Sequence, residues 1–168
     1  MAADFIPTAT VQDYIHVSHG VDDEQINDMV ARARLWVEGY TGLALVKREF
    51  TEKRWPDYTG RIKLYRGPLV SVDEVKYRDH EGVLQNYEPQ AFPPDVIISG
   101  GLNSAWPFAP SRELEIKYTA GFEAIGDIDQ RLVGAVLALV QGEYDSGHAY
   151  PDSALAAAQN CCGFLRPI

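Results

Sequence analysis

The spacing of apolar residues changes twice along this chain of 168 residues, and these changes limit the folds it can adopt. In residues 26–40, apolar side chains recur at three- and four-residue steps, which places them on one stripe of a helix. Between residues 46 and 118, short runs alternate apolar with polar and are broken by Gly, Pro and Asp, as is typical of antiparallel strands. From residue 129 the helical spacing returns. The order of helices, strands and helices predicts an α+β fold.

A long helix is predicted over residues 23–41. Asp22 or Asp23 can cap its free N–H groups, and an acidic first turn suits the helix dipole. Gly42 can supply the left-handed residue that ends a helix. We expect this helix and the later ones to pack together as a small bundle.

Three further helices are indicated. Thr10 and Asp13 resemble a capping box that opens a short helix. The segment 132–140 is apolar on nearly all sides, so its helix must be buried by its own fold or by a neighbouring subunit. A last helix is expected over residues 154–162, with Ser153 as its cap.

The central region is predicted to form short antiparallel strands. Two apolar runs are out of phase across Asp73 and Glu74, which indicates a bulge, and residues 79–82 have the composition of a hairpin turn. Prolines at 89, 93, 94, 107 and 110 argue against regular central strands around them. The strands are expected over 61–65, 70–77, 83–87, 96–99 and 113–118.

The acidic charge is concentrated at the two ends of the chain. The formal charge is −9 in total, with −6 in residues 1–30, −4 in residues 119–168 and +1 between them. This acidity argues against a surface built to hold nucleic-acid phosphates. The longest apolar run, 132–140, is too short to cross a bilayer, and the N-terminus lacks the features of a secretory signal. The adjacent Cys161 and Cys162 cannot build a disulfide framework, so we expect free thiols.

No residue pattern requires an enzyme. His16 and His19, with Asp13 or Asp22, could in principle offer metal ligands, but they lie across the expected end of a short helix, where the rings need not converge. A nucleophile elbow and a phosphate-binding loop are missing from the sequence. We therefore predict a protein that is not an enzyme and has no cofactor, metal or catalytic residues; a metal-dependent hydrolase using the two histidines is an alternative.

Three large aromatic side chains lie beside prolines in segments expected to be irregular: Trp55, Trp106 and Phe108. Such side chains are often interface anchors, because they bury a large area at little entropic cost. We predict that they contact a neighbouring protein surface, although they could equally cover the edge of their own sheet. A second alternative is a small-molecule or glycan binding module, in which the same rings would line a concave pocket.

The order of segments resembles the head-tail connector (adaptor) proteins of tailed bacteriophages and gene transfer agents. The resemblance rests on the helical segment 11–42 with its Val-Asp-Asp-Glu cap, the Arg-Gly-Pro-Leu-Val-Ser-Val-Asp-Glu-Val-Lys-Tyr stretch at 66–77, and the Leu-Glu-Ile-Lys-Tyr-Thr-Ala-Gly-Phe corner at 114–122. The terminal Leu-Arg-Pro at 165–167 is also similar to the closing tail of that family. The likeness covers nearly the whole chain, and it depends on packing and turn residues.

The resemblance implies a structural component of the particle neck, made in the bacterial host cytoplasm. It implies one connector domain, with residues 1–45 helical, 46–120 rich in β-structure and 121–168 helical with a C-terminal tail. The expected partners are the portal, neck or tail-completion proteins, and copies of the same chain in a dodecameric ring; a monomer in solution stays open. Genome DNA would pass through without specific binding, and no membrane is involved. We expect the tail to contact the portal through Leu165, Arg166, Pro167 and Ile168.

Overall fold

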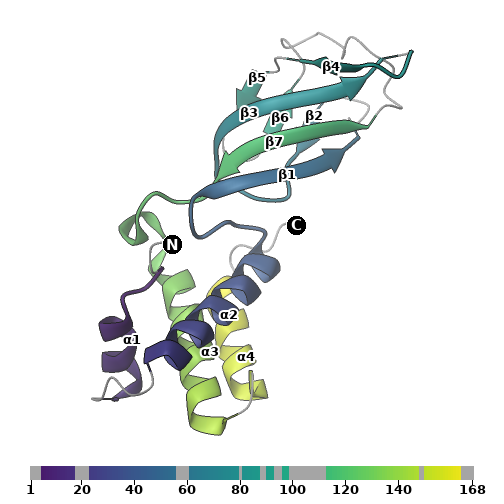
Figure 1. Cartoon of the computed structure of the whole chain (residues 1–168). Helices are drawn as coiled ribbons and strands as arrows, with labels where there is room; N and C mark the ends of the chain where they lie inside the picture. The colour runs from purple at the N-terminus through teal and green to yellow at the C-terminus, as the bar shows by residue number, and fades with distance from the viewer. Residues whose placement is uncertain are drawn as a thin grey trace. The chain divides into compact units, whose positions relative to one another are not determined.

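The chain divides into two compact units, each with its own core (Figure 1). The helical unit comprises Met1–Leu45 and Glu123–Ile168, and the β unit comprises Val46–Phe122. The structure, a computed structural model, describes residues 5–17, 23–55, 61–79, 81–87, 90–92, 96–98, 113–147 and 150–163. The β unit is therefore inserted between the two halves of the helical unit.

The described residues of the helical unit form four α-helices: α1 (Thr8–Ile15), α2 (Asp23–Thr41), α3 (Gln130–Ser146) and α4 (Asp152–Cys162), with a short 3₁₀ turn, η2 (Ile125–Asp127), before α3. Helix α3 contacts all three of the other α-helices, and α2 also contacts α1 and α4. The N-terminal and C-terminal helices thus pack together, which confirms the predicted α+β class with a small bundle.

Helix α3 occupies the centre of the bundle because its sequence offers apolar side chains in nearly every direction. Leu132, Val136, Leu139 and Val140 are all buried, so the helix is covered by its own fold. At Gly142, an added Cβ would lie 2.4 Å from the Cβ of Ala154 on α4. A glycine here lets the two helices approach more closely than any side chain would permit.

The bounds of α2 agree with the prediction, and α3 begins with a side-chain cap. Helix α2 has the predicted bounds, and Gly42 after it has a φ of 75°. Asp129 caps α3, and its carboxylate accepts a hydrogen bond of 2.9 Å from the backbone N of Arg131. Both ends follow the ordinary capping chemistry of short polar side chains and glycine.

Two predicted caps are wrong. Helix α1 begins at Thr8 after Pro7, so Thr10 lies inside the helix and does not cap it. Helix α4 begins after Pro151, one residue before the predicted cap at Ser153. In both cases a proline takes the N-cap position without a side-chain hydrogen bond. Its fixed φ prepares the start of a helix, and this backbone effect outweighs the polar side chains that follow.

In the part of the β unit that the structure describes, the strands form two antiparallel sheets. The larger has the order β1 (Arg48–Arg54), β7 (Leu114–Ala120), β3 (Leu69–Arg78) and β4 (Leu84–Asn86), and the smaller has the order β2 (Arg61–Lys63), β6 (Val96–Ile98) and β5 (Gln90–Phe92). Strand β7 lies between β1 and β3 in the larger sheet. Its alternate residues Leu114, Ile116, Tyr118 and Ala120 are buried, so this face of the sheet forms the core of the unit.

The predicted bulge at Asp73 and Glu74 lies within β3, which is one continuous strand. Strand β3 changes register against β7 between Val72 and Glu74, which confirms the predicted bulge. The hairpin turn is also confirmed: the backbone N of Asp79 donates to the carbonyl of Val83, and that of Gly82 donates to Asp79. The chain between Pro89 and Pro93 forms the short edge strand β5, which agrees with the prediction that these prolines exclude regular central strands. Prolines beside an edge strand are compatible with its pairing on one side only.

The chain enters and leaves the β unit at adjacent points. The backbone N of Lys47 donates a hydrogen bond of 3.1 Å to the carbonyl of Phe122, and the N of Gly121 donates one of 2.9 Å to Pro68. Gly121 has a φ of 121°, and an added Cβ would lie 2.5 Å from the carbonyl oxygen of Val46. Only glycine fits this corner, for both conformational and steric reasons.

Candidate functional site

One of the three predicted aromatic contacts can be placed. Trp55 follows β1, and 58% of its surface is exposed, so it does not cover the core of its own sheet. Trp106 and Phe108 lie outside the described residues, as do the predicted portal contacts Leu165, Arg166, Pro167 and Ile168.

The histidine pair gives no support for a metal site. His16 is exposed at the C-terminal end of α1, with a left-handed φ of 59°, and His19 lies outside the described residues. Across the part of the chain that the structure describes, no three His, Cys, Asp or Glu side chains come together as metal ligands would. The two thiols are free, as predicted. Burial, followed by the neighbouring Cys161, raises the pKa of Cys162 to about 11, which leaves little thiolate at neutral pH.

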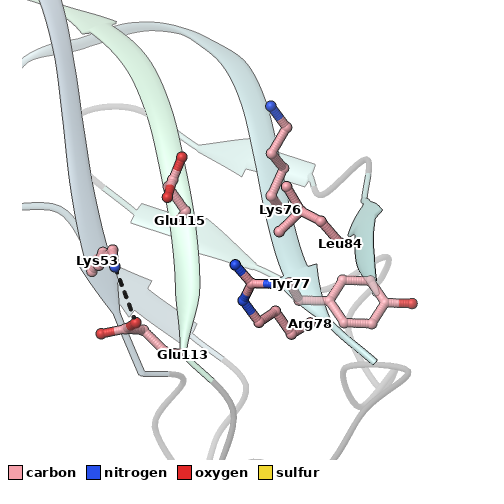
Figure 2. A pocket seen from close by; sticks show the side chains of 7 residues that line it. All are labelled: Lys53, Lys76, Tyr77, Arg78, Leu84, Glu113 and Glu115. Atoms are coloured by element: carbon pink, nitrogen blue, oxygen red, sulfur yellow. Dashed lines mark ion pairs between the residues drawn. The ribbon is translucent and has the colours of Figure 1, made fainter. Parts of the chain in front are cut away.

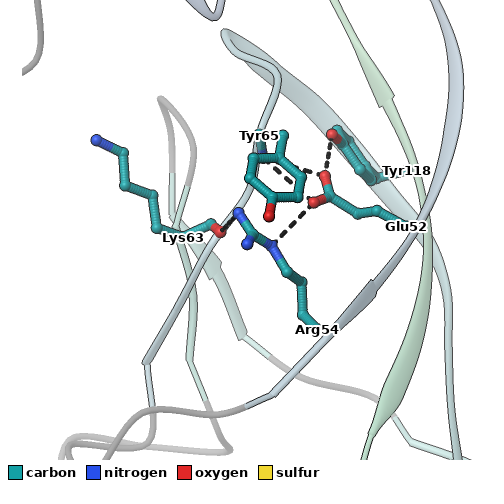
Figure 3. A network of polar contacts seen from close by, with 5 residues as sticks. All are labelled: Glu52, Arg54, Lys63, Tyr65 and Tyr118. Atoms are coloured by element: carbon teal, nitrogen blue, oxygen red, sulfur yellow. Dashed lines mark hydrogen bonds and ion pairs between the residues drawn. The ribbon is translucent and has the colours of Figure 1, made fainter.

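Several basic residues lie on β1, at the end of β2 and in the segment that follows β2. We call Arg48, Arg54, Lys63, Tyr65 and Arg66 the basic edge. Figure 3 shows Arg54 reaching across from β1 to this segment: its guanidinium donates a hydrogen bond of 2.8 Å to the carbonyl of Lys63 and lies 3.2 Å from the centre of the Tyr65 ring. Arg54 therefore joins the two strands through polar and cation–π contacts.

The carboxylate of Glu52, within the β unit, binds residues of the basic edge. Glu52 accepts hydrogen bonds from the hydroxyl of Tyr118 and from the backbone N of Tyr65, the latter at 3.1 Å, and it pairs with the Nε of Arg54 at 3.0 Å (Figure 3). Burial raises the pKa of Tyr118, and the bond to Glu52 raises it further, so the hydroxyl stays protonated and donates. Two aromatic rings lie beside this network. Phe50 stacks on Tyr118, and Arg48 lies 5.0 Å from the centre of the Phe50 ring.

The basic edge presents positive charge in a chain that is acidic overall. Glu52 is only 11% exposed as a side chain, and both of its oxygens have partners, so little of its charge faces the solvent. Lys63 and Tyr65 are exposed, the latter by 65%. Residues 47–66 contain seven basic and three acidic residues, whereas residues 67–122 contain four and eight. The near-neutral middle of the chain thus separates into a basic part and an acidic part.

The opposite face of the larger sheet is a mixed-charge surface. A depression of about 330 Å³ lies on this face. Figure 2 shows the side chains that line it, among them Lys53 on β1, which pairs with Glu113 at 3.5 Å. Lys76 turns to Glu74 of its own strand at 2.6 Å, and Lys117 pairs with Glu49 at 2.9 Å. The depression is lined by Lys53, Lys76, Tyr77, Arg78, Leu84, Glu113 and Glu115. This charged lining differs from the aromatic pocket that a glycan-binding module would need.

The helical unit carries the acidic charge. It has thirteen acidic residues, four arginines and no lysine, which gives it a formal charge of −9. Two acidic side chains are used inside the bundle: Glu143 binds Arg32 at 2.6 Å, and Glu38 accepts a hydrogen bond of 2.9 Å from the backbone N of Leu45. Most of the others are exposed, namely Asp13, Asp23, Glu24, Asp28, Glu123, Asp127, Asp145 and Asp152.

These surfaces are suited to binding other macromolecules by charge and shape. The described side chains provide exposed cations, exposed carboxylates and exposed aromatic rings. Sequence reasoning found the exposed Trp55 and the acidic ends, but it missed the basic edge. The available signal was the absence of any acidic residue between positions 58 and 72. In the described part of the chain, none of the helices has the length and apolar character needed to span a membrane.

The fold is shared with components of gene transfer agent (GTA) particles. A chain in the neck of the empty GTA particle with C6 symmetry is 20% identical, with a TM-score of 0.79 over 100% of this chain and 94% of that one. A chain in the neck of the native particle with C12 symmetry is 21% identical, with a TM-score of 0.76 over 100% and 93%. A chain in the virion of the native particle is 23% identical, with a TM-score of 0.73 over 92% and 88%. No family model and no curated protein matches the sequence.

Proposed function

We propose that this protein is a structural neck component of a phage-like particle, an adaptor that forms a ring beneath the portal. The observation that carries this proposal is the full-length likeness to a chain of the GTA particle neck, which includes both the helical unit and the β unit. An adaptor in this position extends the DNA channel and offers a docking face for neck or tail proteins. Its work is non-enzymatic and depends on shape and association.

The charge of the chain supports a role as a passage for DNA. Each lysine or arginine that binds a phosphate releases counterions and adds affinity, so a wall with many such contacts would hold the DNA in place. The helical unit has a charge of −9, and the lysines of the mixed-charge sheet face are paired with carboxylates. The genome would therefore pass without specific binding.

The ring is proposed to contain twelve copies, in line with the C12 symmetry of one of the similar necks. Trp55 is the described candidate for a contact between subunits or with a neck protein, because its large ring is mostly exposed. Trp106 and Phe108 remain candidates for the same contact.

Imaging of the protein mixed with purified portal tests this function. We expect one coaxial ring on each portal in electron micrographs. Portals that stay bare at micromolar protein concentrations would contradict the proposal. Measurable turnover of a substrate, or tight and salt-sensitive binding to duplex DNA, would also contradict it.

The C-terminal tail is the proposed portal contact. Deletion of Leu165, Arg166, Pro167 and Ile168 should abolish portal binding and leave folding intact, because these residues follow the last described helix turn at Gly163. A matched control replaces the exposed α4 residues Gln159 and Asn160 by alanine and keeps the tail. The same portal affinity for the truncated chain and the control would remove the tail from the contact.

A further inference from the structure

The second half of α2 presents an uncharged, partly apolar surface to the solvent. Leu35 has 53% of its surface exposed, and Ala31 and Gly39, one helical turn before and after it, are exposed as well. These three residues are spaced by four positions, so they lie along one line of the helix. We call Ala31, Leu35 and Gly39 the α2 ridge.

The packing of its own chain does not require the glycine in this ridge. A Cβ added at Gly39 would meet nothing within 4 Å, although glycine is among the least favourable residues in a helix. Gly142 on α3 is the opposite case, because a Cβ there would lie 2.4 Å from Ala154. A second chain that packs closely on the α2 ridge would use the space that Gly39 leaves open.

An arginine beside the α2 ridge lacks a counter-charge. Arg34 is half-buried, and its Nε is enclosed without a hydrogen-bond partner. It forms no ion pair with any residue that the structure describes. A buried N–H donor without an acceptor is unfavourable, and so is a partly desolvated cation without a carboxylate. The position therefore favours an acidic group supplied by another chain.

The charge of the helical unit limits which of its faces can meet in a pair of copies. Units that each carry −9 repel one another, so we expect contact at faces without exposed carboxylates. Residues 31–42 contain one acidic residue, Glu38, which is buried, and residues 153–163 contain no charged residue. Exposed carboxylates on α1, in the first turns of α2 and in the last turn of α3 make those faces less suitable.

The outer face of α4 complements the α2 ridge. Ala156 and Asn160 are exposed, and Asp152, one turn before Ala156, is exposed at the first position of the helix. These three residues are again spaced by four positions, so α4 offers a line of small, neutral side chains that begins with a carboxylate. Asp152 has no ion pair with another residue in the described ranges.

We propose that the α2 ridge of one copy packs on the outer face of α4 of a second copy, with Leu35 against Ala156 and Arg34 paired with Asp152. The inference rests on the proposed ring and names the helices that form its contacts. Each copy uses α2 toward one neighbour and α4 toward the other, and repetition of such a heterologous contact closes a ring when the rotation fits. The small side chains on both helices allow the close approach that buries Leu35.

Duplex DNA is a less suitable occupant of the α2 ridge. A phosphate backbone is held by several cations along a face. Residues 31–42 contain two, of which Arg32 is already paired with Glu143 at 2.6 Å. Phosphates would also leave Leu35 uncovered, whereas a second helix covers it.

A charge placed in the ridge tests the apolar part of the contact. The carboxylate of Leu35→Glu is solvated in a separate chain and desolvated in the contact, so we expect at least about a tenfold loss of rings on purified portal in electron micrographs. Tyr14→Glu is the matched control, because it makes the same change of net charge at an exposed position of α1, and it should leave assembly unchanged. Circular dichroism and thermal melting check the folding of every variant. Normal assembly by Leu35→Glu would overturn the contact.

A side chain added at Gly39 separates folding from assembly. Gly39→Gln should raise the melting temperature of the chain, because glutamine favours a helix and the surrounding space is empty. The same side chain occupies the space of the partner helix, so we expect at least about a fivefold loss of rings. A more stable variant that assembles as well as wild type would show that no partner fills this space, and it would refute the packing of α4 on the ridge.

A charge exchange tests the ion pair. Asp152→Arg brings two cations together at every contact, so we expect at least about a tenfold loss of rings. Addition of Arg34→Glu in the same chain restores opposite charges, and assembly should return to within about threefold of wild type. If Arg34→Glu prevents folding, Arg34→Gln replaces it, since removal of the like charge should still raise assembly above that of Asp152→Arg alone. A second change that brings no recovery would refute the pairing.

Disulfide cross-linking separates this inference from the proposed function. The background carries Cys161→Ser, which removes the half-buried thiol. A Leu35→Cys chain is mixed with an Ala156→Cys chain that carries a larger affinity tag, and the mixture is oxidised both in concentrated solution and on portal. We expect linked pairs of mixed mass, which can form only between two copies.

The two failures then differ. Bare portals together with mixed pairs in solution would refute only the adaptor function. Rings on portal without mixed pairs would refute only the named contact. Pairs of two Leu35→Cys chains as the main product would also refute it, because two α2 ridges would then face each other.

Discussion

The two units of this protein differ in the interactions that stabilise each of them internally. The core of the helical unit is made of apolar side chains around α3, and its charge of −9 is mostly on the surface. The β unit has eleven basic and eleven acidic residues, and it places Glu52, Arg54 and Tyr118 in a polar network that joins two sheets. Packing therefore dominates one unit, while paired charges contribute to the architecture of the other. Substitutions in each unit can measure how far this difference extends.

Leu139→Ala in the helical unit should have the largest effect. Leu139 is fully buried on α3, so the substitution removes apolar contacts and leaves a cavity, at a cost of about 2–5 kcal/mol in the free energy of unfolding. Urea denaturation followed by circular dichroism at 222 nm measures it. Exposed Leu35→Ala on α2 is the control and should cost less than about 0.5 kcal/mol. Equal effects of the two substitutions would contradict the apolar core described for this unit.

Gly121→Ala should damage the β unit by about 2–4 kcal/mol, because it combines a disfavoured φ with a backbone clash. Hydrogen exchange of the β7 amides is the measurement, and we expect their protection to fall more than that of α3. Gly126→Ala is the matched control, since an added Cβ there meets nothing within 4 Å. Unchanged β7 protection would show that the corner relaxes without cost.

Tyr118→Phe should cost about 1.5–3 kcal/mol, since it removes a hydroxyl that donates to a charged carboxylate and keeps the ring stacked on Phe50. Chemical denaturation of the variant gives the value. Tyr14→Phe, at an exposed position on α1, provides the comparison and should be close to neutral. A neutral result for Tyr118→Phe would mean that the polar network contributes little, and the contrast between the units would then be one of surface charge alone.

The smallest expected effect is a pH dependence at the start of α3. A hydrogen bond from the Arg131 guanidinium, with one from its backbone N, lowers the pKa of Asp129 from 3.8 to about 2. The lowered pKa means that the contribution of this group to stability is present above pH 3.8 and is lost as the pH falls through about 2. Carboxyl NMR titration measures the pKa directly, and Arg131→Ala should move it upward. An unchanged titration in that variant would exclude the guanidinium as the cause.

Sequence patterns predicted the helical unit more completely than the β unit. The apolar stripe of Ile26, Val30 and Val37 predicts α2, and the apolar side chains on nearly all sides of Leu132–Val140 predict a buried α3. Both predictions succeed because a helix buries residues that are near one another in sequence. The caps at Thr10 and Ser153 were wrong because a proline upstream had the stronger effect on the backbone. Helix positions are thus local properties, and their errors are confined to the ends.

The candidate site in the β unit depended on contacts that the sequence does not reveal. Glu52 and Tyr118 are separated by 66 positions, and they meet only because β1 pairs with β7. The period of two along β1 places Glu52 on the same face as Phe50 and Lys53 on the other, but it does not reveal that Tyr118 would donate to the Glu52 carboxylate. The bulge at Asp73 and the turn at Asp79 were predictable, because both follow from the composition of a few adjacent residues.

The insertion of the β unit between α2 and α3 has a consequence during protein synthesis. A ribosome delivers α1 and α2 first, then the 77 residues of Val46–Phe122, and only afterwards the central helix α3. The apolar stripes of the nascent α1 and α2 therefore stay without their packing partner α3 while the β unit, up to the turn at Gly121, is synthesised. Completion of the bundle is a late event of translation, and chaperones that shield apolar helices would act on this chain during that interval.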